Sequence, residues 1–372
     1  MMRVTFILLC LFSSFANAAA QVCQQRHCVA VVDAGSTGSR LHIYAYDLDG
    51  KNTPIQVDQI WLKKVKPGFA SIELKNIDAY LADLFSKAPD QHIPVHFYAT
   101  AGMRLVSQAK QQLYYQSLHN WFSTQNQWML QDAKTITGKQ EGIFGWLALN
   151  YKLGTLQSKD KPLVSMMDMG GASVQIAIPA EHSEAIDPKD LVQLDIYDRH
   201  VTLFVHSFLG LGQTEVSHHY LNAANCFPYD YPLPNESTGQ GDAQSCQQDI
   251  SKLINSVHDV NKLVNPVLIA NSNPSWYAVS GLATLVKNGL FNFKNNQFTS
   301  QDMLQQADSE LCHQSWQTLI KLNKYNDYTF IDCLNSSYYY GLLVNGYGLQ
   351  PSQLVNFMSD EDEPDWTLGA VL

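Results

Sequence analysis

Two short segments combine an aspartate, two glycines and hydroxyl side chains, and each directly follows an apolar run. The first is DAGSTGSR (33–40) and the second is DMGGAS (168–173). Glycines let a backbone pass close to a ligand, and successive N–H groups in such a turn form a site for an anion. Either segment could be a plain polar turn between strands, but the donor content favours phosphate binding. Because the whole pattern recurs, the sequence also indicates an internal duplication.

A carboxylate that could assist hydrolysis stands at the head of an apolar helix. The segment TGKQEGIFGWLALNYKLG (137–154) predicts a helix with Thr137 as its N-cap and Gly154 at its end. Glu141 lies in its early turns, where a carboxylate complements the helix dipole. The same position suits a base held beside a reacting water. From this segment alone, the dipole role is favoured.

The elements around these segments alternate between strands and helices. Apolar runs of strand length flank both turns, and another ends at Thr100 within PVHFYATAGMRL (94–105). We expect further strands at His200–Phe208 and Trp276–Val279, and helices at 106–122, 137–154, 247–264, 301–323 and 337–345. The alternation predicts an α/β architecture. The length of 372 residues predicts two domains.

The composition excludes some partners. The net charge is −10 and no basic stripe is present, so nucleic acid is not an expected ligand. In an acidic protein with phosphate-binding turns, we expect a divalent cation between the carboxylates and the ligand. The 12 histidines show no close-set ligand pattern, and the pair His218-His219 is expected on a helix surface. No zinc site is predicted.

The first 20 residues have the features of a cleavable signal peptide, with Arg3 followed by an apolar run and small residues up to Ala20. Cleavage near Ala18–Ala20 leaves six cysteines, and an even number in an exported chain predicts three disulfides. The simplest pairing joins sequence neighbours, Cys23–Cys28, Cys226–Cys246 and Cys312–Cys333, although other pairings are possible. No later segment has the length and apolarity of a membrane span. We therefore expect a monomeric, secreted or periplasmic protein without a transmembrane anchor.

Five segments occur in the order of one family: DAGSTGSR, ATAGMR (99–104), GKQEGIFGWLALN (138–150), DMGGASVQIA (168–177) and DWTLGAV (365–371). By these motifs the chain resembles the apyrases, also called nucleoside triphosphate diphosphohydrolases or CD39-like ecto-ATPases, in the actin/Hsp70/sugar-kinase superfamily. The resemblance spans residues 29–370 and points to a soluble bacterial-type or secreted member. It implies two ribonuclease-H-like domains with the active site in the cleft between them. The implied lobes are 21–155 with 350–372, and 156–349, after a signal peptide at 1–20.

The resemblance also implies roles for individual residues. Nucleoside tri- and diphosphates such as ATP and ADP would be hydrolysed to monophosphates with Mg²⁺ or Ca²⁺, and Glu141 would be the base that activates water. The implied metal-site residues, acting mostly through water, are Asp33, Asp168, Thr100 and Gln175. The implied phosphate-binding residues of the two turns are Ser36, Thr37, Gly38, Ser39, Gly170, Gly171, Ala172 and Ser173. Arg40 and Arg104 are the cations near the turns, and each either contacts phosphate or pairs with a carboxylate.

The chain departs from its relatives at the residues that would recognise the nucleobase of the substrate. AVSGLATLV (278–286) has no aromatic residue where animal members have a tyrosine, and FLGLGQTEV (208–216) lacks an arginine found there in relatives. Tyr338 is the candidate residue that flanks the nucleobase, and packing within a helix is its alternative role.

Three other functions fit parts of the pattern. An exopolyphosphatase of the same superfamily would share both turns but not GKQEGIFGW in this form. A sugar kinase would share the fold, but export to a compartment poor in ATP disfavours it. A non-catalytic, secreted nucleotide-binding protein would have the turns without a working base.

Overall fold

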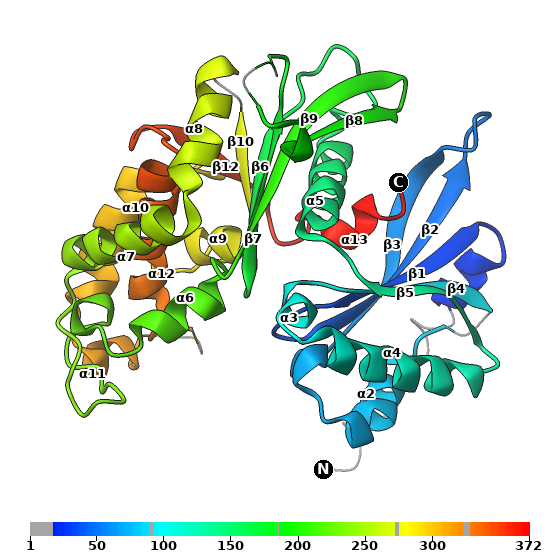
Figure 1. Ribbon diagram of the computed structural model, residues 1–372, viewed down its shortest axis with the longest axis horizontal. Helices are drawn as coiled ribbons and strands as arrows, with labels where there is room; N and C mark the ends of the chain where they lie inside the picture. Colours follow the sequence, from blue (N-terminus) through cyan, green and yellow to red (C-terminus); the bar gives the residue numbers. More distant parts are fainter. Residues whose placement is uncertain (1–17, 90–91, 183, 185, 272–274, 323–327) are drawn as a thin grey trace. The chain divides into compact units, whose positions relative to one another are not determined.

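The structure is a computed structural model that describes residues 18–89, 92–182, 184, 186–271, 275–322 and 328–372 (Figure 1). These residues form two compact units: unit 1 runs up to Ala148 and includes Asp365–Leu372, and unit 2 is Leu149–Pro364. Residues 1–17 of the expected signal peptide lie outside the described residues. No helix in the described ranges has the length and apolarity needed to cross a membrane.

Unit 1 is built on a five-stranded sheet with the strand order β3-β2-β1-β4-β5. Its strands are β1 (His27–Ala34), β2 (Ser39–Leu48), β3 (Pro54–Val65), β4 (Ile93–Ala99) and β5 (Trp128–Thr135). β2 is antiparallel to both β1 and β3, whereas β4 runs parallel to β1 and β5 parallel to β4. The carboxyl ends of β1, β4 and β5 therefore meet at one edge of the sheet.

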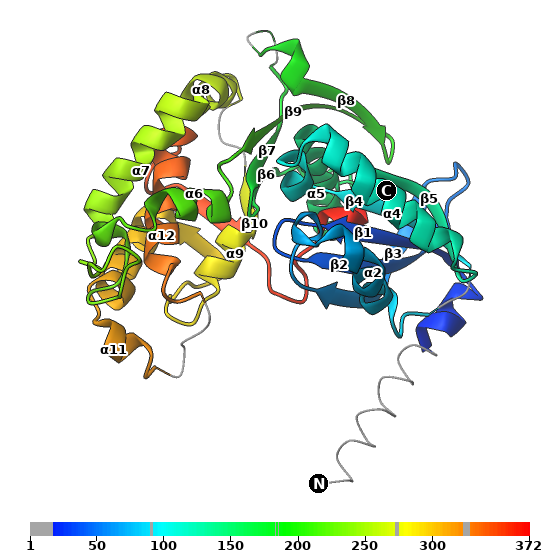
Figure 2. The ribbon, with the colours of Figure 1, turned by 60° about the horizontal axis from the view of Figure 1, so that its bottom comes forward.

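Helices cover both faces of this sheet. They are η1 (Phe69–Ser71), η2 (Leu74–Asn76), α2 (Ile77–Phe85), α3 (Ala101–Arg104), α4 (Gln108–Ser123), α5 (Gly138–Lys152) and α13 (Trp366–Gly369). Leu81 of α2 and Leu118 of α4 share a buried core with Ile43 of β2, and both helices lie on one face of the sheet (Figure 1, Figure 2). On the other face, Trp366 of α13 stacks on Tyr98 of β4.

Unit 2 is built on a seven-stranded sheet with the order β11-β12-β10-β6-β7-β9-β8. Its strands are β6 (Ser165–Met169), β7 (Ser173–Pro179), β8 (Leu191–Ile196), β9 (Arg199–Leu209), β10 (Trp276–Ser280), β11 (Gln297–Thr299) and β12 (Leu354–Phe357). The order β9-β7-β6-β10-β12 repeats the order and the directions of β3-β2-β1-β4-β5. This repetition confirms the duplication that the two turns predict.

The helices of unit 2 differ in part from those predicted. They are η3 (Pro188–Asp190), α6 (Gln213–Tyr220), η4 (Ala224–Cys226), α7 (Ala243–His258), α8 (Val260–Ala270), α9 (Gly281–Val286), α10 (Ser300–Ala307), α11 (Trp316–Leu319) and α12 (Asp332–Tyr340), with π-helical turns η5 (Asp308–Cys312) and η6 (Gly341–Gly346). The single helix predicted over 247–264 is two helices, because Asp259 between them is left-handed, with φ 52°. The helix predicted over 301–323 is likewise divided, and α12 begins before the predicted residue 337.

The boundaries of the two units differ from those of the two lobes that the resemblance implies. Residues 350–364, expected with the first lobe, belong to unit 2 because β12 pairs with β10 and β11 in its sheet. The other division falls within α5, between Ala148 and Leu149.

Three disulfide bonds link cysteines that are neighbours in the sequence. They are Cys23–Cys28, Cys226–Cys246 and Cys312–Cys333. This is the pairing that the sequence predicts. Such bonds persist in oxidising compartments, so they fit an extracellular or lumenal protein.

A buried carboxyl group at the start of α12 makes the stability of unit 2 depend on pH. Asp332 is 5% exposed and accepts a 2.7 Å hydrogen bond from Asn288. Burial raises the pKa of Asp332 to about 7, although the bonds from Asn288 and Asn335 oppose the rise. The folded chain thus holds a proton that the unfolded chain releases above about pH 4. The stabilisation is complete below that pH and is lost as the pH rises through 7.

We therefore expect Asp332→Asn to flatten the pH dependence of unfolding. Asparagine keeps an oxygen for Asn288 but carries no charge at any pH. Between pH 5 and pH 8 the parent should lose about 2–3 kcal/mol of stability that the variant keeps. Urea denaturation of both proteins at the two pH values measures the difference. Equal slopes for parent and variant would contradict the prediction.

Candidate active site

The turn between β1 and β2 offers backbone donors to a ligand. It is closed by a 3.0 Å hydrogen bond from the N–H of Gly35 to the carbonyl of Gly38. The N–H groups of Ser36, Thr37 and Gly38 have no protein partner within the described ranges. Adjacent N–H groups left in this way form a nest for an anion. The geometry thus supports the phosphate-binding interpretation of this turn over that of a plain polar turn.

The side chain of Ser39 is not part of this donor set. It is fully buried, and its hydroxyl accepts a 2.9 Å hydrogen bond from Tyr80 of α2. Since side chains alternate along a strand, Ser39 lies on the α2 face of β2 and the next residue, Arg40, on the opposite face. Ser39 was expected to bind phosphate, and its side chain is instead buried against α2.

Asp33 stands at the end of β1, directly opposite Arg40 of β2. Arg40 donates a 2.6 Å hydrogen bond to Oδ2 of Asp33, whereas Oδ1 is buried and has no hydrogen-bond partner among the described residues. Burial raises the pKa of Asp33 to about 6, against the lowering effect of Arg40. An unpartnered buried carboxylate oxygen is costly unless a ligand such as a cation meets it.

The end of β4 is packed against the first turn. Thr100 is buried, and its N–H donates to the carbonyl of Ala34 at 3.3 Å. Two residues on, a Cβ atom at Gly102 would stand 2.8 Å from Cα of Ser36. Only glycine permits so close an approach. Thr100 is therefore held beside the turn, as its expected role in the same site requires.

Arg104 at the end of α3 forms an ion pair with Glu141 in the first turn of α5. Both side chains are largely buried, at 14% and 11% exposed. Both arginines singled out in the sequence thus pair with carboxylates, Arg40 with Asp33 and Arg104 with Glu141. A guanidinium has five donor hydrogens, so this pairing leaves either arginine capable of binding phosphate as well.

The start of α5 is fixed by a capping box, which holds Glu141 in place. The hydroxyl of Thr137 accepts the N–H of Gln140 at 3.1 Å, and the side chain of Gln140 accepts the N–H of Thr137 at 3.0 Å. This arrangement confirms Thr137 as the N-cap. Because β5 ends at Thr135, the helix begins at the same edge of the sheet as the first turn.

The turn between β6 and β7 in unit 2 repeats this geometry. The N–H of Gly170 donates to the carbonyl of Ser173 at 3.0 Å, as Gly35 does to Gly38. The N–H groups of Gly171 and Ala172 have no protein partner in the part of the chain that the structure describes. This turn therefore forms a second nest suited to an anion.

Asp168 occupies in unit 2 the place that Asp33 has in unit 1. It is buried and faces Gln175 of β7, as Asp33 faces Arg40. The amide of Gln175 donates to the hydroxyls of Ser173 at 2.6 Å and Ser207 at 3.1 Å. Unit 2 thus brings Asp168, Ser173 and Gln175 together.

Two glycines outside the predicted site support the turns. A Cβ atom at Gly68 would stand 2.1 Å from the carbonyl oxygen of Ser36, and one at Gly212 would stand 2.3 Å from that of Gly171. Each glycine follows the third strand of its repeat, β3 or β9. The signal available in the sequence is a glycine at the same place in both halves, in VKPGFAS and FLGLGQTEV.

Tyr338 does not take the role proposed for it in base binding. It is fully buried in the core of unit 2, and its hydroxyl donates to the carbonyl of Leu211. No ring face is left for a nucleobase, so the structure favours the packing alternative. The histidines His218 and His219 are exposed on α6, as the sequence predicts.

The residues present fit a weakly held, hydrated cation. The described residues contain no cluster of three or more histidine, cysteine, aspartate or glutamate side chains that could hold a metal ion. A Mg²⁺ ion bound to phosphates needs only one or two carboxylates and keeps several waters. The buried oxygen Oδ1 of Asp33, which has no hydrogen-bond partner, suits such an ion.

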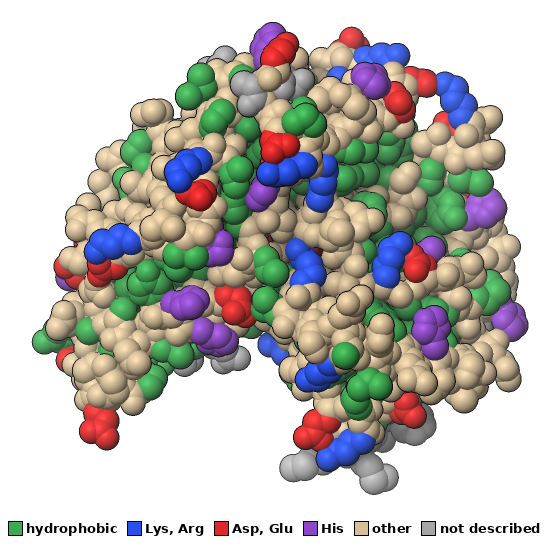
Figure 3. All heavy atoms as spheres, viewed as in Figure 1, with side chains coloured by type: hydrophobic (Ala, Val, Ile, Leu, Met, Phe, Trp, Pro, Cys, Tyr) green, Lys and Arg blue, Asp and Glu red, His purple; other side chains and the backbone are tan. Residues whose placement is uncertain are grey.

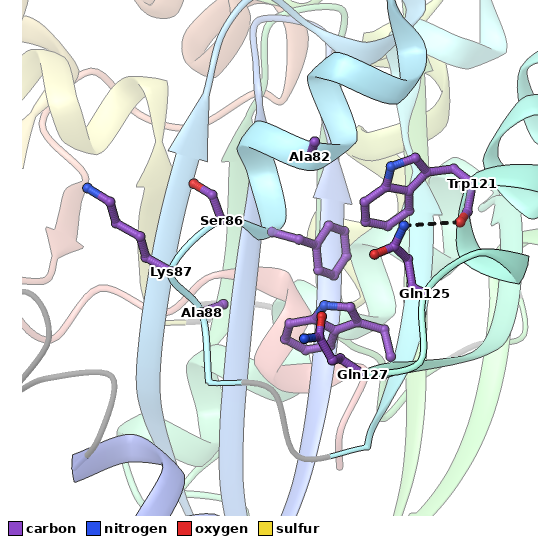
Figure 4. Close-up of a pocket in the computed structure, with 9 residues that line it drawn as sticks. Ala82, Ser86, Lys87, Ala88, Trp121, Gln125 and Gln127 are labelled. Carbon is purple, nitrogen blue, oxygen red and sulfur yellow. Dashed lines mark hydrogen bonds between the residues drawn. The ribbon is translucent and has the colours of Figure 1, made fainter.

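A pocket of about 360 Å³ in unit 1 lies elsewhere and contains none of the predicted site residues. It is lined by Ala82, Phe85, Ser86, Lys87, Ala88, Trp121, Gln125, Gln127 and Trp128 (Figure 4). The amide of Gln125 points to the carbonyl of Trp121. Trp128 begins β5, so the pocket is at the opposite edge of the sheet from the first turn.

On the face drawn in Figure 3, acidic and basic side chains are interspersed and form no basic stripe.

Comparison with protein families finds one match over nearly the whole chain. Residues 20–227 and 231–372 match the model of the GDA1/CD39 (nucleoside phosphatase) family. Among curated proteins, ectonucleoside triphosphate diphosphohydrolase 1 of Mus musculus is 26% identical over 411 residues, covering 92% of this chain and 79% of that protein.

Two solved structures share the fold. A nucleoside triphosphate hydrolase from Neospora caninum superposes with a TM-score of 0.65 at 14% identity, covering 96% of this chain and 94% of its own. An Aquifex aeolicus member of the Ppx/GppA family superposes with a TM-score of 0.55 at 13% identity, covering 93% of this chain and 96% of its own. These likenesses confirm the two-domain α/β fold expected from the sequence.

Proposed function

The chain belongs to the GDA1/CD39 (nucleoside phosphatase) family, and on that premise we propose that it is a secreted hydrolase that removes terminal phosphates from nucleoside tri- and diphosphates. The name of the mouse relative, a nucleoside triphosphate diphosphohydrolase, supports both substrate classes. The observation that carries the proposal is the repeated aspartate-and-turn arrangement. Each unit has a nest of backbone donors beside a buried aspartate, and each nest by itself suits a phosphate group.

We assign Glu141 the role of general base. Hydrolysis of a phosphoanhydride needs a positioned water and neutralised charge rather than a covalent intermediate. The ion pair with Arg104 fixes the direction of the Glu141 carboxylate. A carboxylate within hydrogen-bond reach of the attacking water can accept its proton.

The phosphates would be bound by the backbone donors of residues 36–38 and 171–172, with Arg40 and Arg104 able to add charge. Mg²⁺ or Ca²⁺ would be held by Asp33, Asp168, Thr100 and Gln175, mostly through water. When bound, such an ion neutralises the charge that develops on the phosphate oxygens. This assignment names no residue that recognises the nucleobase of the substrate.

The proposal predicts a substrate pattern. ATP and ADP should both release phosphate while AMP is spared, because a monophosphate cannot fill two nests and still present a phosphate leaving group. Phosphate release from ATP, ADP, AMP and polyphosphate, with Mg²⁺ present, measures the pattern. Glu141→Gln protein purified in the same way controls for contaminating phosphatases.

The same panel separates the alternatives. The Ppx/GppA protein has the same fold, so an exopolyphosphatase is the second candidate, and strong preference for polyphosphate would favour it. Rapid cleavage of AMP would also contradict the proposal. Absence of turnover with all four compounds would favour a nucleotide-binding protein without catalysis.

A further inference from the structure

Three polar residues follow one another on the same face of β2. Side chains of Arg40, His42 and Tyr44 alternate with Leu41 and Ile43, which belong to the core beneath α2 and α4. The face that carries Arg40 is thus the face on which Trp366 of α13 contacts the sheet. Asp365 and the residues of α13 come from the far end of the chain, yet they belong to unit 1.

Asp365 anchors α13 to this polar face. Its Oδ1 accepts the N–H of Thr367 at 3.0 Å and its hydroxyl at 2.8 Å, which caps the helix. Its Oδ2 lies 3.5 Å from Nε2 of His42, whose side chain is only 3% exposed. Nδ1 of His42 is 2.7 Å from the side-chain oxygen of Gln59. Because that oxygen can only accept, Nδ1 carries a hydrogen, and Nε2, which has no hydrogen-bond partner among the described residues, can donate to Asp365 only when the ring is protonated.

The charges of Asp365, Arg40 and Asp33 act on one another. Burial alone would raise the pKa of Asp365, but the nearby His42 and Arg40 and the bonds from Thr367 hold it below its ordinary value. The pKa of Asp33 is raised first by burial and further by Asp365, against the effect of Arg40. The geometry agrees, because Arg40 contacts Asp33 directly and lies two residues from His42, the neighbour of Asp365, on the same face of β2.

The charge of Asp365 affects how strongly Asp33 can attract a cation. An aspartate that is paired with one guanidinium carries little net charge with which to attract a divalent ion. A second carboxylate near the same guanidinium restores a negative potential there. We propose that Asp365, held in place by Thr367, is a positioning residue of the active site, which offsets the charge of Arg40 so that Asp33 can bind the catalytic cation. The inference rests on the proposed function, and it goes beyond it by adding a residue that contacts no substrate.

The test is Asp365→Asn in the full mature chain. Asparagine is an equally good N-cap, so it can keep the bond from the N–H of Thr367 and loses only the charge. The Mg²⁺ concentration for half-maximal ATP hydrolysis should rise about tenfold or more. Calorimetric titration of Mg²⁺ into protein equilibrated with a non-hydrolysable ATP analogue should show the same weakening. Asp365→Glu restores the charge on a poorer cap and should recover the parent's Mg²⁺ requirement even if it unfolds at a lower temperature.

The matched control is Asp242→Asn. Asp242 caps α7 in the same manner, accepting the N–H of Ser245 at 2.9 Å and its hydroxyl at 2.6 Å. This variant should leave the Mg²⁺ requirement unchanged. If Asp365→Asn behaves like Asp242→Asn, the inference is wrong. If Asp365→Asn does not fold, Asp365→Ser supplies another uncharged cap, and a parent-like requirement in that variant would equally overturn it. Absence of ATP hydrolysis by the parent would contradict the proposed function instead.

Discussion

Glu141→Gln should lose about 10²–10⁴-fold of its ATP turnover, the range that general-base assistance typically supplies. The amide keeps the shape of the side chain and an oxygen for Arg104, but it cannot accept a proton from water. Initial rates at saturating Mg²⁺ and ATP measure the loss. Binding of a non-hydrolysable ATP analogue should remain, which would show that the nucleotide site is still formed.

The ion pair between Glu141 and Arg104 increases the loss of stability that we expect from Glu141→Gln. A glutamate that only complements the helix dipole would cost about 0.3–1 kcal/mol when neutralised. Glu141 instead pairs with the largely buried Arg104, and a hydrogen bond to a charged group contributes about 1.5–3 kcal/mol. We therefore expect a lower melting temperature as well as lower turnover.

Gln140→Ala separates these two effects. It removes the side chain that accepts the N–H of Thr137 in the capping box, so it should cost about 0.5–1.5 kcal/mol of stability, the contribution of a typical hydrogen bond. Its turnover should stay within a few-fold of the parent, because Gln140 takes no part in the proposed chemistry. If Glu141→Gln hydrolyses ATP as well as Gln140→Ala does, then Glu141 is not the base.

Removal of divalent cations should abolish turnover, by at least about 10²-fold, because a bound cation supplies several kcal/mol of charge stabilisation in phosphoryl transfer. Activity should return when Mg²⁺ or Ca²⁺ is added in excess of the chelator. Asp33→Asn and Asp168→Asn should each require more of the cation for the same activity, whereas Asp242→Asn should not. Full activity in EDTA would show that the two buried aspartates serve another purpose.

Much of the site could be predicted because it depends on local sequence. Both turns, the N-cap Thr137 and the three disulfides depend on residues close together in the chain, and the structure confirms the capping bonds and the pairing. The repeated strand order follows from the same recurring pattern.

The features that sequence could not supply depend on side-chain direction or on distant contacts. Tyr338 points into the core because of the face of α12 on which it lies. The break between α7 and α8 falls at Asp259, with no glycine or proline to mark it. The pairing of His42 with Asp365 joins residues from opposite ends of the chain, and only the folded sheet brings them together.

The repeat in the two sheets has an evolutionary consequence. The two halves kept the same aspartate, turn and supporting glycine, but they diverged at the residue opposite the aspartate, which is Arg40 in one half and Gln175 in the other. The difference at this one facing position gives the two copies unequal electrostatic properties. In one copy the facing strand supplies a countercharge to its carboxylate, and in the other it supplies a neutral amide. Division of labour between the two halves could begin with this one position, while the backbone that both inherited stayed the same.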